Sequence, residues 1–161
     1  MAAYTGYPVS RGSVHITNAS DPRASPHFEA AFLSHPADPP TLVWAYKVAR
    51  EMARRMRCVV GEVPASHPPF DPSSAVRCCP EYDRPATWDP DQVPRLTYSP
   101  QDDAIIEAWV RETALTTWHS LGTCAMKPRA DGGVVDPHLR VHGVDRLMVV
   151  DLSICPDNVG A

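Results

Sequence analysis

The sequence lacks a long apolar run and lacks an excess of positive charge. Its longest uninterrupted apolar stretch is only a few residues, whereas a membrane-spanning helix needs roughly 20, so we expect no transmembrane segment. Lysine and arginine number 15 against 19 aspartate and glutamate residues, a formal charge of −4. Proteins that bind nucleic acid through their net charge need an excess of cationic side chains, which displace counterions from phosphate. The negative net charge therefore excludes this kind of binding.

Cysteine is scarce and irregularly spaced. The five cysteines form an odd number without a C-x-x-C pair, which favours neither a disulfide framework nor a zinc site, and buried free thiols are expected. His138 and His142 have the spacing of helical metal ligands, but an extended segment would hold them roughly 13 Å apart, so no metal site is predicted. No serine lies in a G-x-S-x-G turn, so a hydrolase triad is not indicated. Residues Met1–Tyr4 lack the cationic start and apolar stretch of a secretory signal.

Proline, in contrast, is abundant, at 18 of 161 residues, about twice its usual share. Half of the prolines lie between residues 61 and 100, which excludes a regular helix there. A structureless stretch of this length is unusual inside a compact domain. We therefore expect residues 61–100 to wrap over a surface supplied by something else, a neighbour that is missing from this chain; a proline-rich ligand for a binding module is the competing interpretation.

Regular elements are predicted on both sides of this stretch. Apolar residues recur every three or four positions from Leu42 to Met56, which predicts an amphipathic helix capped by Thr41. Ser99, followed by proline and acid, predicts the start of a second helix that ends near Thr116. Short strands are predicted at residues 13–17, 28–33, 134–135 and 147–150. The last of these is continuously apolar, as a strand buried on both faces would be.

His119 is the candidate catalytic residue on local grounds. It follows the second predicted helix, next to the bulky Trp118 and shortly before the Gly122–Thr123 turn. A histidine that a rigid scaffold holds on a loop can act as an acid or a base near neutral pH. Taken alone, a hydrogen-bonded structural histidine remains the alternative interpretation.

Several separated segments, in the same order, resemble one family of enzymes. The segments Thr117–Met126, Gly133–Pro137, Leu139–Val144 and Leu147–Asp157 closely resemble the C-terminal motif of the glucose-methanol-choline (GMC) oxidoreductases, which are flavin-dependent alcohol oxidases and dehydrogenases. The fungal alcohol (methanol) oxidase branch is the most similar, through Tyr7–Gly12, His35–Asp38, Val43–Lys47 and Asp151–Gly160. The resemblance covers nearly the whole chain apart from the proline-rich middle.

The resemblance implies a fold and a place in a larger protein. The implied fold is α+β, with a mainly antiparallel sheet and helices on one face, as in the C-terminal, substrate-side domain of GMC oxidoreductases. Residues 1–161 would form this domain, incompletely, with residues 61–100 as its wrapping segment. The sequence contains no G-x-G-x-x-G turn, which in this family sets the cofactor's pyrophosphate on a helix N-terminus. The N-terminal FAD-binding domain is therefore expected to be absent from this chain.

The resemblance also implies roles for particular residues. His119 matches the family's active-site histidine, a general base that takes the alcohol's hydroxyl proton while hydride passes to the flavin. Trp118 corresponds to a wall of the flavin pocket. Asp151 and Leu152 correspond to the segment whose backbone approaches the cofactor's ribityl and pyrophosphate region. The family's second catalytic residue, Asn or His, would come one position after Ala161.

The function implied is that of the C-terminal part of an FAD-dependent alcohol oxidase. Such an enzyme oxidises a small primary alcohol to an aldehyde, with molecular oxygen as acceptor and hydrogen peroxide as product. The chain alone is expected to be inactive, since its partner would be the absent FAD-binding domain; neither nucleic acid nor a membrane is expected to bind. A non-catalytic binding or assembly module and an inactive gene fragment that retains the fold remain as alternatives. A homo-oligomer and a peroxisomal or cytoplasmic location are both compatible with the resemblance.

Overall fold

The computed structural model describes residues 3–158 and residue 160. They divide into two compact units. Unit 1 is built mainly from His35–Ala114, and unit 2 from Thr5–Ser34 together with the chain from Leu115 onward. Unit 1 is therefore almost continuous in sequence, whereas unit 2 combines two distant segments of the chain. Val159 and Ala161, which belong to the last motif of the sequence, lie outside the described residues.

Helix α1 (Asp38–Arg54) begins earlier than the sequence predicted. Its first turn contains Pro39 and Pro40, where a missing N–H breaks no intrahelical hydrogen bond. Asp38 adds negative charge at the helix N-terminus, which the helix dipole favours. The cap residue is Ala37, so the prediction of Thr41 as the cap was wrong. Thr41 lies inside the helix.

Helix α2 (Pro100–Thr113) begins where the sequence predicted. Ser99 Oγ accepts a hydrogen bond from the Asp102 backbone N–H at 3.1 Å, and the Asp102 carboxylate accepts one from the Ser99 N–H at 2.8 Å. This reciprocal capping box satisfies N–H groups that have no partner inside the helix. The helix ends at Thr113 and not at the predicted Thr116, because the backbone of Ala114 is extended.

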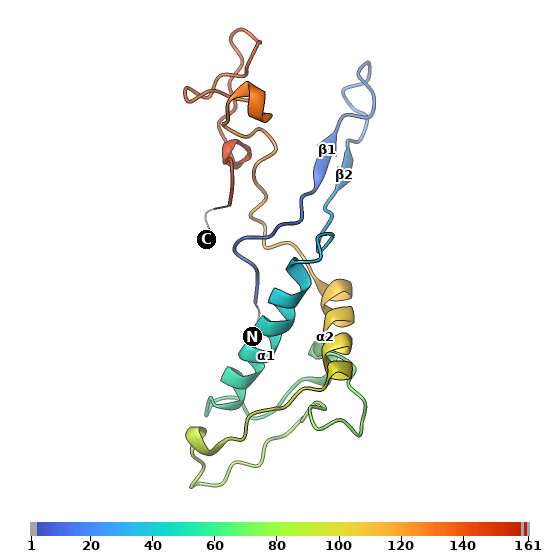
Figure 1. Ribbon diagram of the computed structural model, residues 1–161, viewed down its shortest axis with the longest axis vertical. Helices are drawn as coiled ribbons and strands as arrows, with labels where there is room; N and C mark the ends of the chain where they lie inside the picture. The colour runs from blue at the N-terminus through green and yellow to red at the C-terminus, as the bar shows by residue number, and fades with distance from the viewer. Residues whose placement is uncertain (1–2, 159, 161) are drawn as a thin grey trace. The chain divides into compact units, whose positions relative to one another are not determined.

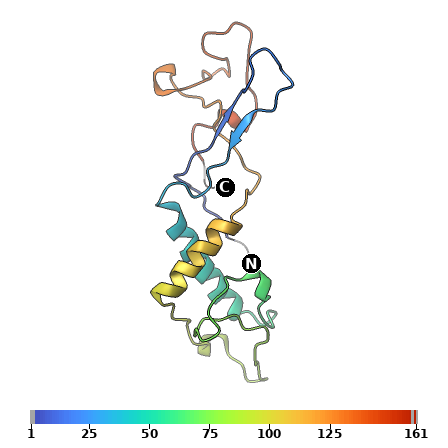
Figure 2. The ribbon, with the colours of Figure 1, turned by 90° about the vertical axis from the view of Figure 1, so that its right-hand side faces the viewer.

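The two helices pack against each other in unit 1. They lie side by side in Figure 1 and again in the turned view of Figure 2. The rings of Tyr46 and Trp109 meet edge to face, with centroids 5.7 Å apart. A salt bridge between Lys47 Nζ and Asp103 Oδ1, 2.5 Å long, also joins α1 to α2. Ile106 of α2 is fully buried and anchors the apolar contact.

The proline-rich segment packs on helices of its own chain. Between residues 61 and 100 the only helical turns are the short 3₁₀ turns η1 (Pro64–Ser66) and η2 (Pro90–Gln92), which agrees with the predicted lack of regular helix. Val76 is fully buried, and its carbonyl oxygen accepts a hydrogen bond from Arg50 of α1 at 2.8 Å. The segment therefore covers part of α1. That it also covers a further domain stays a prediction.

Unit 2 contains an antiparallel hairpin. Strand β1 (Ser13–His15) pairs with β2 (His27–Glu29), and Val14 lies opposite Phe28. The α+β class and the antiparallel pairing are confirmed, with shorter strands than predicted. Gly12 leads into β1, and a Cβ atom at this position would lie 2.3 Å from the carbonyl oxygen of Glu29. Only glycine allows the two backbones to approach this closely.

The later strand predictions were wrong in extent. Val135, predicted in a strand, forms only isolated bridges with Met126 and Val141, and the 147–150 run forms only one, between Arg140 and Met148. Leu147, Met148 and Val150 are 49%, 54% and 72% exposed, so this run is not a strand buried on both faces. Its backbone hydrogen bonds in the described chain go to residues 139 and 141. No helix of the described part of the chain has the length and apolar character needed to span a membrane.

Candidate functional site

Unit 2 brings the two predicted parts of the site onto neighbouring segments. Three backbone hydrogen bonds connect them: Gly122 N–H to Leu152 O (3.4 Å), Cys124 N–H to Ser153 O (2.8 Å) and Met126 N–H to Ile154 O (2.8 Å). The segment that follows His119 therefore runs alongside the segment that follows Asp151. The sequence separates these segments by about thirty residues, and only the fold shows that they pair.

His119 and Trp118 lie on an exposed loop. The Trp118 side chain is 86% exposed, and His119 is exposed as well. Trp118 has a positive φ of 65°, which bulky residues rarely adopt, and its N–H donates to Thr116 Oγ1 at 3.0 Å. Other histidines are held by hydrogen bonds, such as His67 to Tyr46. The imidazole of His119 has no such bond within residues 3–158 and 160.

Asp151 and Leu152 form the second part of the site. The Asp151 carboxylate accepts a hydrogen bond from the Ser153 N–H at 2.8 Å and caps the short turn η4 (Leu152–Ile154). Hydrogen bonding to Ser153 holds the pKa of the Asp151 carboxyl below its ordinary value. The Leu152 side chain is 56% exposed. The carboxylate therefore fixes the local backbone, and the leucine offers an apolar surface.

The exposed residues of unit 2 can be compared with what a flavin needs. The exposed indole of Trp118, next to the exposed His119 in the sequence, suits contact with a planar aromatic ring. A pyrophosphate needs several N–H groups, usually at a helix N-terminus. The described residues of unit 2 form only three-residue helical turns, η3 (Arg129–Asp131) and η4. They therefore offer an apolar surface suited to an aromatic ring and no long helix whose N-terminus could bind a pyrophosphate.

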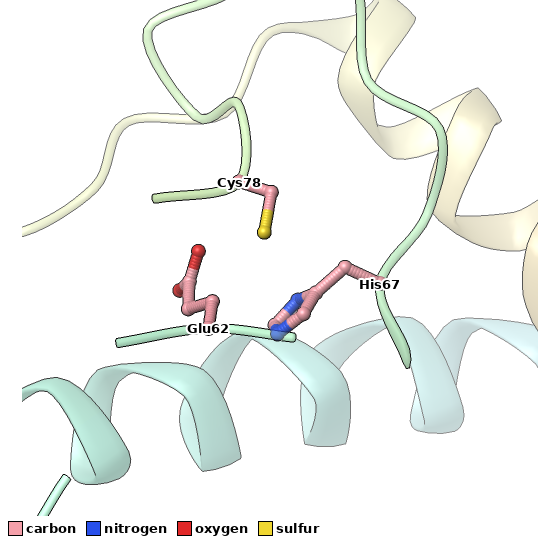
Figure 3. Close-up of side chains that lie close together, drawn as sticks. All are labelled: Glu62, His67 and Cys78. Atoms are coloured by element: carbon pink, nitrogen blue, oxygen red, sulfur yellow. The ribbon is translucent and has the colours of Figure 1, made fainter. Parts of the chain in front are cut away.

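A second cluster of functional side chains lies in unit 1, where the sequence predicted no site. Glu62, His67 and Cys78 each place one potential metal ligand within 4.8 Å of the other two. Figure 3 shows the carboxylate, the imidazole and the thiol converging on one another. Carboxylate, imidazole and thiolate are all ligands of zinc, so the cluster has to be tested as a metal centre.

The hydrogen bonds of Glu62 argue against a metal in this cluster. Its Oε1 accepts from Arg50 Nε (2.6 Å) and Tyr82 Oη (2.8 Å), and its Oε2 accepts from Arg50 (2.8 Å) and the Cys79 N–H (2.8 Å). These four bonds use the four lone-pair positions of a carboxylate. A cation would have to displace one of them and would lie close to the positive charge of Arg50. Glu62 is instead the centre of a hydrogen-bond network with Arg50, Tyr82 and Cys79.

The ionisation of the cluster is consistent with this interpretation. Burial raises the pKa of the Glu62 carboxyl, but the hydrogen bonds from Arg50, Cys79 and Tyr82 outweigh burial and lower that pKa to about 2. Burial lowers the pKa of His67 and raises the pKa of the Cys78 thiol. At neutral pH these shifts leave Glu62 negatively charged and His67 and Cys78 neutral, and Arg50 supplies the positive charge that pairs with Glu62. No sequence spacing would have identified the hydrogen-bond network of Glu62, since Arg50 lies 12 residues before it and Tyr82 lies 20 residues after it.

Comparisons with known proteins point to one family of enzymes. Residues 8–161 match the family model of the GMC oxidoreductases. The chain is 37% identical to the alcohol oxidase of Candida boidinii and 39% identical to alcohol oxidase 1 of Komagataella phaffii, in each case over 99% of this chain and 30% of the relative. A solved fungal aryl-alcohol oxidase superposes with a TM-score of 0.60 at 30% identity, over 96% of this chain and 21% of that one. The chain thus spans about a third or less of the proteins it matches.

Proposed function

Because the chain belongs to the GMC oxidoreductase family, we propose that it is the C-terminal, substrate-side part of an FAD-dependent alcohol oxidase. Its substrates are a small primary alcohol and molecular oxygen. The observation that carries this proposal is the exposed His119, beside exposed Trp118, on a segment that three backbone hydrogen bonds connect to Leu152–Ile154, the turn that Asp151 caps. The alcohol oxidases of Candida boidinii and Komagataella phaffii support the reaction class.

In this proposal His119 is the general base. A ring nitrogen of its imidazole takes the proton of the alcohol's hydroxyl group, which raises the electron density on that oxygen and favours departure of hydride from the neighbouring carbon. When bound, FAD would supply the hydride acceptor and the electron path to oxygen, which takes up two electrons and two protons to become hydrogen peroxide. One of these protons comes with the hydride, and the other replaces in the balance the proton that the His119 imidazole takes from the alcohol and releases to solvent. An exposed imidazole without a hydrogen-bond partner in the described chain is free to accept a substrate's proton.

The neighbouring residues orient the reactants. The exposed indole of Trp118 provides the apolar wall against which the flavin ring would pack, and the backbone at Asp151 and Leu152 would approach the cofactor's ribityl and pyrophosphate region. Covering the indole also removes water from His119, and charge interactions are stronger where water is excluded. Asp151 acts indirectly, because its carboxylate caps the turn that holds Leu152 in place.

A hybrid enzyme tests this function. Residues 1–161 would replace the matched stretch of Komagataella phaffii alcohol oxidase 1, which then supplies the FAD-binding domain and the residues that follow. We expect a flavin absorbance spectrum and alcohol-dependent hydrogen peroxide, measured with a peroxidase-coupled assay. His119→Ala should lower kcat by about 10² to 10⁴-fold, the usual contribution of a general base. The matched control, His138→Ala, changes an exposed histidine outside the site.

The outcome of this experiment separates the proposal from its alternatives. Equal loss of kcat in His119→Ala and His138→Ala would contradict the role of His119. A hybrid that folds without flavin, and in which His119→Ala changes nothing, would favour the non-catalytic assembly module. The isolated chain should show neither flavin absorbance nor peroxide production, because unit 2 offers only the ring end of the cofactor site.

A further inference from the structure

The motif Tyr7–Gly12 has no role in the proposed chemistry, yet its first residue contacts the end of the described chain. Gly160 has a φ of 78°, and a Cβ atom built on it would lie 2.4 Å from Tyr7 Oη and 2.6 Å from Tyr7 Cζ. A Cβ atom on Gly6 would lie 3.2 Å from Gly160 Cα. The backbone of Gly160 therefore lies directly against Gly6 and the ring of Tyr7.

Gly160 is hydrogen-bonded to the segment that continues from the candidate site. Its N–H donates to Asn158 Oδ1 at 2.9 Å. Asn158 follows η4 in the sequence, and η4 is hydrogen-bonded to the segment that comes after His119. A shift of Gly160 would therefore disturb its bond to Asn158, which belongs to the same segment as η4.

We propose that Tyr7 is a positioning residue of the proposed active site, which acts by holding Gly160 through contact of its ring with the Gly160 backbone. The catalytic consequence rests on the proposed function; the contact does not. By resemblance, the family's second catalytic position comes shortly after Gly160. Tyr7 touches neither substrate nor cofactor in this proposal. Its side chain is 73% exposed, so it contributes little to the core of unit 2.

Glycine is required at position 160 for two reasons. A residue with a side chain would be strained at this positive φ, and its Cβ atom would overlap the Tyr7 ring. Gly132 has a similar φ of 77°, but a Cβ atom added there would meet no atom of the described chain within 4 Å. Gly132 is therefore a matched reference, with the same backbone conformation and no contact to a ring.

Nuclear magnetic resonance on the 161-residue chain tests the contact directly. The sequence contains only 8 glycines, so the amide signals of Gly160 and Gly132 can be resolved and assigned. We expect Tyr7→Ala to shift the Gly160 amide signal. It should also speed the hydrogen exchange of that amide about tenfold, because the Gly160 backbone loses its contact with the ring and opens locally. The Gly132 signal should not move. Tyr7→Phe, which keeps the ring, should leave Gly160 close to wild type, as should Tyr4→Ala, which changes another exposed tyrosine.

An unchanged Gly160 signal in Tyr7→Ala would overturn the proposal. The catalytic consequence is measured in the hybrid enzyme, where Tyr7→Ala should lower kcat about tenfold with KM nearly unchanged, and Tyr7→Phe should restore kcat. If Tyr7 had only a structural role, Tyr7→Ala would lower the stability of the hybrid enzyme and leave its kcat unchanged. That result would also overturn the proposal. An inactive wild-type hybrid would refute the proposed function. The Gly160 amide signal of the 161-residue chain would still decide whether Tyr7 holds Gly160 in place.

Discussion

Arg50 and Glu62 form a two-pronged ion pair inside unit 1. Arg50 Nε lies 2.6 Å from Oε1 of Glu62, a second guanidinium nitrogen lies 2.8 Å from Oε2, and the two side chains are 3% and 4% exposed. Arg50 also donates to the carbonyl oxygens of Val76 (2.8 Å) and Arg77 (3.1 Å). One side chain of α1 therefore fixes two separate parts of the proline-rich segment.

Replacing Glu62 should destabilise the protein strongly. Glu62→Gln leaves the buried charge of Arg50 without its partner, and breaking a buried pair in this way typically costs about 3–5 kcal/mol. The measurement is the free energy of unfolding from urea titration followed by circular dichroism. Glu107→Gln is the control, because its pair with Arg111 is exposed and should contribute less than about 1 kcal/mol. Similar losses in the two variants would show that the buried pair is unimportant.

The stability of unit 1 should fall in two stages as the pH is lowered. Burial holds the pKa of His67 below its ordinary value of 6.5, so the unfolded chain takes up a proton first and stability declines below that pH. The pKa of Glu62 is lowered from 4.5 to about 2, so the stability it contributes is present above pH 4.5 and lost toward pH 2. Urea titrations at a series of pH values measure both stages. His67→Asn should abolish the upper stage and keep the lower one, and an unchanged upper stage would assign it to another group.

The adjacent cysteines should differ in reactivity. Burial raises the pKa of the Cys78 thiol, whereas Cys79 and Cys58 are exposed. Because the thiolate is the reactive form, iodoacetamide at neutral pH should modify Cys58 and Cys79 before Cys78. Timed quenching and fragmentation mass spectrometry distinguish the neighbouring positions. Cys79→Ser tests whether Cys78 stays slow without its neighbour, and equal rates at all three positions would contradict the buried environment of Cys78.

Zinc should not stabilise the protein. All the acceptor positions of Glu62 are occupied, so the cluster with His67 and Cys78 cannot bind a cation without losing a hydrogen bond. A ligand that binds only the folded state raises the melting temperature, so equal melting temperatures in zinc and in EDTA are expected. A rise in zinc that disappears in Cys78→Ser would instead establish a metal centre.

Local chemistry made some elements predictable and left others undetermined. The start of α2 could be predicted because Ser99 and Asp102 stabilise it through contacts within four residues. The start of α1 was placed too late, because Thr41 is a good cap residue directly before the apolar repeat, whereas the observed cap, Ala37, makes no side-chain hydrogen bond that the sequence could indicate. The run at residues 147–150 was predicted as a buried strand because all four residues are apolar. Apolar character alone does not show whether neighbouring strands are present on both sides.

The candidate site was predictable in its residues and not in its arrangement. His119 and Asp151 stand in recognisable motifs, but their proximity depends on the backbone pairing of Gly122 and Cys124 with the segment near Leu152. The network around Arg50 was missed entirely, because its contacts join α1 to residues 12 to 27 positions further along the chain. Contacts of this kind follow from the fold and leave no local pattern.

The division of unit 2 into two segments determines when the site can form during synthesis. Chains are made from the N-terminus, and domains fold largely as units when their residues have emerged. All of unit 1 precedes Leu115, so α1, α2 and the network around Arg50 leave the ribosome, and can fold, before His119 and Asp151 have emerged. The hairpin of β1 and β2 must wait for the rest of its unit. A translation product that stopped after α2 would therefore contain a folded unit 1 and no candidate site.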